Sequence, residues 1–587
     1  MSGEGIIYRI SGPVVEARQV SGIRMSEQVE VSKERLIGEV IRLEGDRAII
    51  QVYEETTGLK PSDKIYGTGL PMSVELGPGL IGKTFDGIQR PLELIKEKTG
   101  IFVRRGTKVP PLDRSKRWKI KIEVKENQEV YPNTILGRVQ ESNLVEHRIL
   151  VPPGIHGRVT YVIEDGEYPV DTVICRVETS NGERELTMFQ RWPVRLKRPV
   201  KRRLEPSKPL ITGQRVLDFF FPLAVGGAAA IPGGFGTGKT VTQHSLAKWA
   251  HADVIIYIGC GERGNEMTQV LKEFPELIDP KSGRPLLERT ILIANTSNMP
   301  VTARESSIYT GMTLGEYYRD MGYQVAIMAD STSRWAEALR EISGRLEEMP
   351  AEEGFPAYLA SRLAEFYERA GRTIVDNNRE GSVSIIGAVS PPGADFSEPV
   401  TQHTKRFVRA FWALDKELAS ARHFPAISWL DSYSEYLEDV KSWWDEKFEI
   451  NWADLRAKAT ELLQQEANLQ QIVKLVGPDA LPDSQRLILV IAEIIKEAFL
   501  QQNALSVEDA YCDPEKSLRM MDLILHFYEQ AKTVIAKGAP IFKISQLPVL
   551  QKIMRMKNEI KNEELKKFDD ILKQIDAEME ELRSKYE

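Results

Sequence analysis

The chain opens with short apolar runs that are separated by polar turn residues. Stretches such as "IIYRISGPVVEA" and "EVIRLEGDRAIIQVYEET" are rich in β-branched residues and carry glycine or proline between the runs. Runs of this length and composition predict strands rather than helices. We therefore expect a small antiparallel β-barrel over residues 1–72.

A second strand-rich stretch covers residues 113–194. Its segment "VPPGIHGRVTYVIEDGEYPVDTVICRVE" places glycine turns between β-branched runs, which predicts further strands. The stretch resembles a lipoyl-type sandwich, but no lysine occupies the turn that would carry the lipoyl group. We expect an inserted β-rich domain with a structural role.

Apolar runs of strand length then alternate with helix-like segments in residues 195–440, and residues 73–112 are expected to begin the same domain. Alternation of this kind predicts a parallel sheet that is covered by helices on both faces. The runs are "AAAIP", "DVIIYIG", "TILIANT", "QVAIMAD" and "SVSIIGAV".

From residue 441 to 587 the strand signal disappears, and we expect a C-terminal helical domain. Its last segment repeats apolar residues at spacings of three and four, which predicts one apolar seam along a helix. Too few heptads are present for a long coiled coil, which favours packing within the domain, although a partner would fit the same pattern. The seam residues are Leu565, Phe568, Leu572, Ile575, Met579 and Leu582.

Composition narrows the function classes. The 587 residues carry 78 Lys and Arg against 85 Asp and Glu, a net charge of -7, which gives no electrostatic footprint for a nucleic acid. No signal peptide or membrane span is evident, and three scattered cysteines favour a reducing, intracellular setting. A basic run, "RLKRPVKRRLEP", begins at Arg195; we expect a solvated connector there rather than a phosphate-binding strip.

The segment "GGFGTGKT" has the pattern of a phosphate-binding P-loop, and it lies between an expected strand and an expected helix. Its glycines allow backbone N–H groups to converge on an anion at a helix N-terminus. Lys239 would contact the β and γ phosphates, and the hydroxyl of Thr240 would ligate Mg²⁺. The loop residues are Gly233, Gly234, Phe235, Gly236, Thr237, Gly238, Lys239 and Thr240.

Two carboxylates complete the expected chemistry. Asp330 ends the apolar strand "QVAIMAD", at the sheet edge where ligands gather, and would bind Mg²⁺ through water, although a helix N-cap is the alternative. Glu262 follows another strand inside the turn "GCGERGNEM" and is the candidate to activate water. Arg263 beside it would orient Glu262 or contact phosphate. The alternative for both residues is a surface ion pair with no role in catalysis.

Together these motifs resemble the catalytic A subunit of the rotary vacuolar and archaeal type ATPases. The resemblance extends over essentially the whole chain and includes "ELGPGLIGKTFDGIQRPL", "TGQRVLDFFFP", "ANTSNMP", "GAVSPPGADFSEPVTQ" and "RHFPAISW". It implies a ring of three A and three B subunits that turns a central stalk, is held by peripheral stalks, and couples ATP to proton or sodium transport. It also implies a place on the cytoplasmic face of the cell membrane, reached only through the membrane sector, and Mg²⁺ with ATP or ADP and phosphate as ligands.

Carried over by residue, the resemblance assigns Glu262, Lys239 and Arg263 to catalysis and adds Val241, Phe424, Gln502 and Leu505 to the nucleotide contacts. Phe424 matches an aromatic residue that flanks the adenine, although a core ring before a proline would have the same sequence. The arginine finger would come from the neighbouring B-type subunit, so an isolated chain should hydrolyse ATP poorly.

Three positions depart from the family pattern. Gly234 replaces the usual proline of prokaryotic relatives, which should loosen the loop by about 0.4 to 1 kcal/mol. Thr237 replaces the cysteine of eukaryotic members, and Leu505 replaces a usual Phe, which puts one aromatic wall of the adenine pocket in question. The alternative to a catalytic subunit is therefore a ring subunit that binds nucleotide but has a structural or regulatory role. A third hypothesis, an RNA-translocating hexamer, is disfavoured by the net negative charge. Ion selectivity belongs to membrane subunits that are other chains, and the sequence fits either direction, ATP synthesis or ion pumping.

Overall fold

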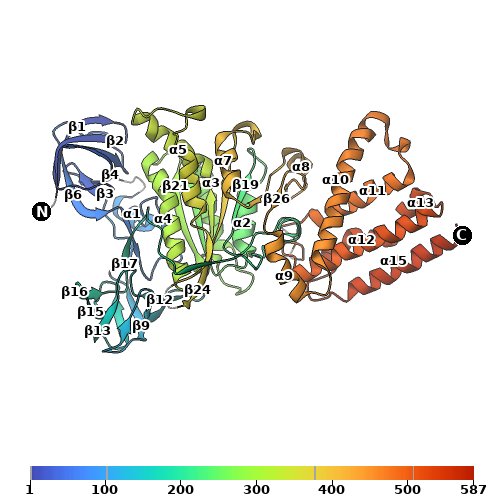
Figure 1. Cartoon of the computed structure of the whole chain (residues 1–587), viewed down its shortest axis with the longest axis horizontal. Helices are drawn as coiled ribbons and strands as arrows, with labels where there is room; N and C mark the ends of the chain where they lie inside the picture. Colours follow the sequence, from blue (N-terminus) through green and yellow to red (C-terminus); the bar gives the residue numbers. More distant parts are fainter. Residues whose placement is uncertain (1–2, 101–103, 376–377, 505, 507, 587) are drawn as a thin grey trace. The chain divides into compact units, whose positions relative to one another are not determined.

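The computed structural model describes residues 3–100, 104–375, 378–504, 506 and 508–586. The described chain forms two compact units. The first contains residues 1–205, 226–228 and 252–408, and the second contains residues 206–225, 229–251 and 409–587. Figure 1 shows the helices and strands of both units with their labels.

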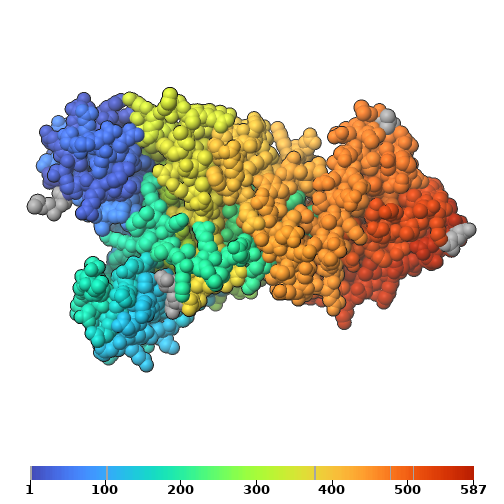
Figure 2. Space-filling view, viewed as in Figure 1, coloured from blue at the N-terminus to red at the C-terminus, as the bar shows by residue number. Residues whose placement is uncertain are grey.

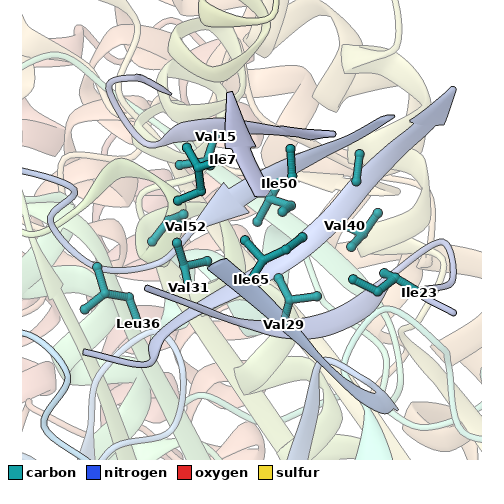
Figure 3. Close-up of a cluster of buried hydrophobic side chains, with 12 residues drawn as sticks. Ile7, Val15, Ile23, Val29, Val31, Leu36, Val40, Ile50, Val52 and Ile65 are labelled. Carbon is teal, nitrogen blue, oxygen red and sulfur yellow. The ribbon is translucent and has the colours of Figure 1, made fainter. Parts of the chain in front are cut away.

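The first unit begins with a closed barrel of six antiparallel strands in the order β1-β2-β5-β4-β3-β6. Side chains of alternate residues point inward and form an apolar core of valine, isoleucine, leucine and alanine (Figure 3). The expected barrel is confirmed. Its strands are Glu4–Ser11, Val14–Ser21, Glu27–Val31, Leu36–Glu44, Arg47–Val52 and Lys64–Pro71, for β1 to β6 in turn.

Two four-stranded antiparallel sheets make up the inserted β-rich part, in the orders β10-β13-β15-β16 and β12-β11-β9-β14. The next strand, β17 (Gln190–Pro193), pairs with β7 (Ser73–Leu76) and returns the chain to the body of the unit. The sandwich strands are β9 Arg117–Ile122, β10 Glu129–Val130, β11 Ile135–Gln140, β12 Glu146–Leu150, β13 Gly157–Val162, β14 Gly166–Pro169, β15 Cys175–Thr179 and β16 Gly182–Leu186.

The centre of the first unit is a parallel sheet with neighbouring strands in the order β24-β22-β20-β21-β8. Strands β20, β22 and β24 are buried almost throughout, as expected for strands covered on both faces. The bounds are β8 Thr84–Phe85, β20 Val254–Glu262, β21 Thr290–Thr296, β22 Gln324–Asp330 and β24 Glu380–Val389, with β23 (Gly371–Ile374) and β18 (Arg202–Leu204) added antiparallel at one edge.

Helix α4 packs on β20, β22 and β24 and is buried around nearly its whole circumference. A helix that is enclosed in this way must find partners for its polar side chains. The helices of this unit are α1 Leu92–Thr99, α3 Gly264–Glu276, α4 Val301–Asp320, α5 Thr332–Arg345, α6 Leu359–Tyr367 and α7 Pro399–Phe407.

Two cations of the basic segment lie inside the first unit, so the expectation of a solvated connector is wrong for them. The Arg198 side chain is fully buried and its Nε lies 2.6 Å from Oδ2 of Asp320 on α4. Arg195 is less than a quarter exposed and is also ion-paired. Buried carboxylates on α4 require neutralising charges, and the segment supplies them.

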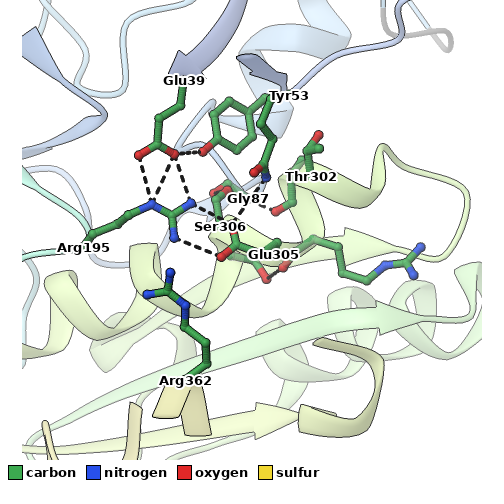
Figure 4. A network of polar contacts seen from close by, with 12 residues as sticks. Glu39, Tyr53, Gly87, Arg195, Thr302, Glu305, Ser306 and Arg362 are labelled. Atoms are coloured by element: carbon green, nitrogen blue, oxygen red, sulfur yellow. Dashed lines mark hydrogen bonds and ion pairs between the residues drawn. The ribbon is translucent and has the colours of Figure 1, made fainter. Parts of the chain in front are cut away.

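Arg195 joins the barrel to α4 (Figure 4). Its guanidinium binds both oxygens of Glu39 on β4 at 2.9–3.2 Å and both oxygens of Glu305 on α4 at 2.9 Å. The Tyr53 hydroxyl donates to the same Glu39 carboxylate. Burial opposes the charge, but Glu305 and Glu39 hold the pKa of Arg195 well above its usual range.

The inserted sandwich is attached to α4 by a second buried polar group. The Glu141 carboxylate accepts N–H bonds from three successive residues, 79 to 81, at 2.8–3.0 Å. Nδ1 of His147 lies 2.7 Å from Glu141, and its Nε2 lies 2.9 Å from the hydroxyl of Tyr317 on α4. Every oxygen of the buried carboxylate therefore has a donor.

The second unit contains three neighbouring strands in the order β26-β25-β19 and a helical C-terminal part (Figure 2). Together with the elements of the first unit, this confirms the expected fold class. The bounds are β19 Ala228–Pro232, β25 Ala410–Phe411, β26 Tyr433–Ser434, α2 Lys239–Trp249, α8 Lys416–Ser420, α9 Leu437–Lys447, α10 Trp452–Val476, α11 Asp483–Ile494, α12 Pro514–Ala536, α13 Ile541–Ser545, α14 Val549–Glu559 and α15 Lys567–Ser584, with π-helical turns η1 Val216–Phe220 and η7 Ile495–Leu500.

The apolar seam of the last helix packs within the second unit, because α15 lies against α12 and α14. Ile571 is buried, whereas Leu572 is only partly buried and Leu565 precedes the helix. The periodicity therefore located the seam, but its buried residue between Phe568 and Ile575 is Ile571 rather than Leu572.

Candidate functional site

The P-loop connects β19 to α2 in the second unit. Gly236 and Gly238 have φ values of 77° and 90°, a left-handed region that glycine enters at no steric cost. Gly238 is the N-cap of α2, so the loop ends at a helix N-terminus, which favours anions. Phe235 is 81% exposed, whereas Thr237 is buried and donates its hydroxyl to the carbonyl of Gly234 at 2.8 Å.

The Lys239 ammonium lies within the curl of this loop. Its Nζ donates to the carbonyl oxygens of Gly233 and Gly234 at 2.6 and 2.9 Å. Thr240 follows in the first turn of α2, and Val241 is exposed on the same turn. The loop therefore holds a cation where the sequence predicted contact with the β and γ phosphates.

Phe424 lies beside the P-loop. Its ring carbon Cε1 would be 3.9 Å from a Cβ placed on Gly238, and 44% of the residue is exposed. Gln502 is buried; its Nε2 donates to the carbonyl of Gly213 at 2.7 Å and its Oε1 accepts from the backbone N–H of Arg215 at 2.9 Å. Its side-chain amide is thus engaged with the backbone. Leu505 lies outside the described residues.

Glu262 lies at the carboxyl end of β20 in the first unit. The pairing of β20 with β21 shifts register between Cys260 and Glu262, a β-bulge that turns the side chain out of the ladder. The residue between them, Gly261, has φ of 72°, and an added Cβ would lie 2.8 Å from Cβ of Arg334. Only glycine fits this position, so the glycine turn fixes where Glu262 points.

Asp330 ends the neighbouring strand β22, where it pairs in register with Gly259 of β20. It is buried and accepts a hydrogen bond from the Tyr257 hydroxyl at 3.1 Å. Burial, the nearby Asp330 carboxylate and a hydrogen bond with Glu266 raise the pKa of Glu262 to about 9, while Arg334 opposes them. Two carboxyl groups at one sheet edge therefore compete for a proton.

Arg263 is the N-cap residue of α3, and its side chain is exposed. Glu266, one helical turn after Glu262, was not predicted from the sequence. The i, i+4 spacing of two acids across the start of a helix is the signal that could have identified it.

Each unit offers an oxygen donor of the kind that Mg²⁺ takes: Asp330 has a carboxylate in the first unit, and Thr240 has a hydroxyl in the second. A cation beside Asp330 would also relieve the repulsion that raises the pKa of Glu262. Within the described residues, no group of three or more His, Cys, Asp or Glu side chains that could hold a metal ion is present.

The site residues divide between the units. Lys239, Thr240, Phe424 and Gln502 belong to the second unit, and the segment 262–330 with both carboxylates belongs to the first. In the part of the chain that the structure describes, no helix is long and apolar enough to cross a membrane.

Four family models match the chain in order. They are the beta-barrel domain of the ATP synthase alpha/beta family at residues 7–69, the barrel-sandwich domain of the ATP synthase alpha/beta chains at 109–195, the alpha/beta nucleotide-binding domain at 213–434, and the C-terminal domain of V and A type ATP synthase at 441–545.

Similar proteins match over nearly the full length. The A subunit of the A-type ATP synthase of Methanopyrus kandleri is 61% identical, with 99% of both chains covered. The V-type ATP synthase alpha chain of Halothermothrix orenii is 58% identical, with 100% of both chains covered. The corresponding A-type ATP synthase protein of Thermococcus onnurineus is 57% identical, with 99% of this chain and 100% of that one covered.

One solved structure shares the fold at low identity. The ATPase EscN, from a type III secretion system of enteropathogenic E. coli, matches with a TM-score of 0.64 and 21% identity, with 89% of this chain and 100% of that chain covered.

Proposed function

Because the chain belongs to the family of A-type ATP synthase A subunits, whose members are also named V-type ATP synthase alpha chains, we propose that it is the catalytic subunit of a rotary ATPase or ATP synthase. It hydrolyses or makes ATP, and the reaction is coupled to ion transport by other subunits. The observation that carries the proposal in the first unit is Glu262 on a β-bulge near Asp330, and the second unit contributes an intact P-loop.

The P-loop binds the nucleotide phosphates. Its left-handed glycines turn N–H groups toward an anion, and the α2 N-terminus adds a favourable dipole. Lys239 exchanges its present carbonyl contacts for phosphate oxygens, so its ammonium group gains a negative partner when nucleotide enters. Phe424 stacks on the base, because an exposed ring beside the loop has a free face for it.

Glu262 orients and deprotonates the attacking water in hydrolysis. The proton on its carboxyl in the ligand-free chain must leave first, because a general base acts in its ionised form. Mg²⁺, when bound with the nucleotide, supplies the positive charge that stabilises the developing charge on phosphate. Thr240 and Asp330 would hold it, Asp330 through water, and Arg263 contacts phosphate.

The partners follow from the same family membership. We propose a B-type subunit on each side in a three-plus-three ring, a central stalk and peripheral stalks, with the chain on the cytoplasmic face of the membrane. A B-type subunit would supply the arginine finger, which is worth about 10³ to 10⁵ in rate.

The test is Mg²⁺-dependent ATP turnover of the complex that copurifies with the chain. We compare the wild type with Glu262→Gln, which keeps the shape but cannot accept a proton, and with Glu276→Gln as a control at the exposed end of the same helix α3. Nucleotide binding is measured on all three by equilibrium titration.

We expect Glu262→Gln to bind MgATP and lose at least about 10²-fold in turnover, as for a general base, while Glu276→Gln keeps the wild-type rate. Wild-type turnover in Glu262→Gln would overturn the base assignment. A wild-type complex that binds ATP without turnover would favour the alternative, a ring subunit with a structural or regulatory role.

A further inference from the structure

The aromatic ring of Phe424 is held in place through the turn η7. The His423 Nε2 lies 3.0 Å from the carbonyl oxygen of Lys496 in η7, and the Phe424 carbonyl accepts the backbone N–H of Gln502 at 2.8 Å. Phe424 and the residue before it are therefore both hydrogen-bonded to the segment 496–502. The position of the ring depends on how firmly this segment is fixed.

Arg215 fixes the end of that segment. Its Nε donates to the carbonyl of Phe499 at 2.6 Å and its Nη2 to the carbonyl of Gln501 at 2.8 Å. Its Nη1 forms an ion pair with Asp509 at 2.6 Å, with both side chains fully buried. The other Asp509 oxygen accepts the N–H of Asn503 at 2.7 Å. One guanidinium thus donates hydrogen bonds to carbonyl groups at the end of η7 and, through Asp509, is also linked to Asn503.

A second cation, on α14, donates hydrogen bonds to carbonyl groups at the same helix end. Nζ of Lys557 donates to the carbonyl oxygens of Glu497 and Gln501 at 2.6 and 3.2 Å. Carbonyl groups at a helix C-terminus lack partners within the helix and carry partial negative charge, so cations are favourable there. Lys557 is half-buried, so it can be replaced with less disturbance than Arg215.

We propose that Arg215 is a positioning residue for base recognition: by fixing η7 and Gln502, it sets the place of the Phe424 ring against which the adenine stacks. This inference rests on the proposed nucleotide-binding function of the same site. The guanidinium bonds of Arg215 go to the segment 499–509, whereas Lys239 bonds with carbonyls of the P-loop. A defect at Arg215 should therefore weaken recognition of the base and leave recognition of the phosphates intact.

The experiment compares two ligands on the intact complex: MgATP, which has a base, and Mg-tripolyphosphate, which has none. Dissociation constants are measured for the wild type, for Arg215→Lys, which keeps the charge but loses the planar fork, and for Lys557→Met. Arg456→Lys is the matched control, because Arg456 is a half-buried cation of the same unit that donates to a backbone carbonyl, that of Phe220 at 2.8 Å.

Base stacking on an aromatic ring corresponds to about 5- to 150-fold in affinity. We expect Arg215→Lys to weaken MgATP about tenfold and Lys557→Met about threefold in the same direction, with tripolyphosphate affinity unchanged. Saturating ATP should restore the wild-type turnover rate, so KM rises while kcat stays. Arg456→Lys should match the wild type for both ligands.

Unchanged MgATP affinity in Arg215→Lys, or an equal loss for both ligands, would overturn the proposal, since the second result describes general disruption. If Arg215→Lys does not assemble, Lys557→Met decides by the same comparison. A wild-type complex that binds ATP but does not turn over would refute the proposed function and leave the binding comparison decisive for Arg215.

Discussion

Replacing Arg195 with methionine should loosen the attachment of the barrel to the body of the first unit. The change removes five charge-assisted contacts and leaves Glu39 and Glu305, whose side chains are 2% and 4% exposed, without their shared cation. Removing one partner of a buried ion pair costs about 3–5 kcal/mol. We place Arg195→Met at the upper end, because two carboxylates lose the same partner.

Hydrogen exchange of the barrel amides measures this cost directly. A loss of about 3–5 kcal/mol in the free energy of barrel opening should speed exchange there by about 10² to 10³-fold or more. Arg42→Met is the matched control, because Arg42 also joins the barrel strand β4 to the body, through Glu348 at 3.1 Å, but is 41% exposed. Exposed pairs contribute about 0–1 kcal/mol.

Two results would refute the reasoning. The first is exchange in Arg195→Met that matches Arg42→Met. The second concerns the triple variant in which Glu39 and Glu305 are also replaced by glutamine. If unpaired buried charge causes the loss, this neutral variant should recover most of the lost stability. A triple variant as labile as the single one would contradict that cause.

Three further predictions concern the sites described above. Because the pKa of Glu262 is raised to about 9 in the folded chain, the unfolded chain releases this proton first, and the stability falls as the pH rises from the unfolded value towards 9. Glu262→Gln should therefore melt above the wild type at pH 9 and level with it near pH 4, and an equal difference at both pH values would contradict this. Gly261→Ala should lower the stability by about 1–3 kcal/mol and should also lower turnover, since φ is 72° and the Arg334 side chain is too close to an added Cβ. The control is Gly283→Ala, which also has a positive φ but open space around it, so it measures the cost of the backbone conformation alone. Burial opposes ionisation of Glu141, but His147 and backbone donors lower its pKa, so its stabilisation is present at neutral pH and lost in acid. Glu141→Gln should cost about 1–3 kcal/mol at pH 7 in thermal or denaturant unfolding, and progressively less as the pH falls below the unfolded value.

Much of the architecture and the phosphate-binding loop could be predicted from the sequence because their signals are local. A strand, a glycine loop and a helix follow one another within 22 residues from Ala228 to Trp249, and glycine conformations there need no distant partner. The parallel strands were recognisable because continuous apolar runs indicate burial on both faces. Glu262 and Asp330 could be predicted as site residues because each lies at the end of such a strand.

The tertiary structure alone decided what the charged and polar groups between these elements do. The basic segment was predicted to be solvated, yet Arg195 meets carboxylates 156 and 110 residues away, and Arg215 meets Gln502 at a separation of 287 residues. No window of sequence contains both partners of such a pair, and the same residues exposed to water would have the same local pattern. The sequence by itself therefore determined the strands, helices and phosphate loop, whereas burial, which sets the strength of a charge pair and the pKa of Glu262, is a property of the folded chain.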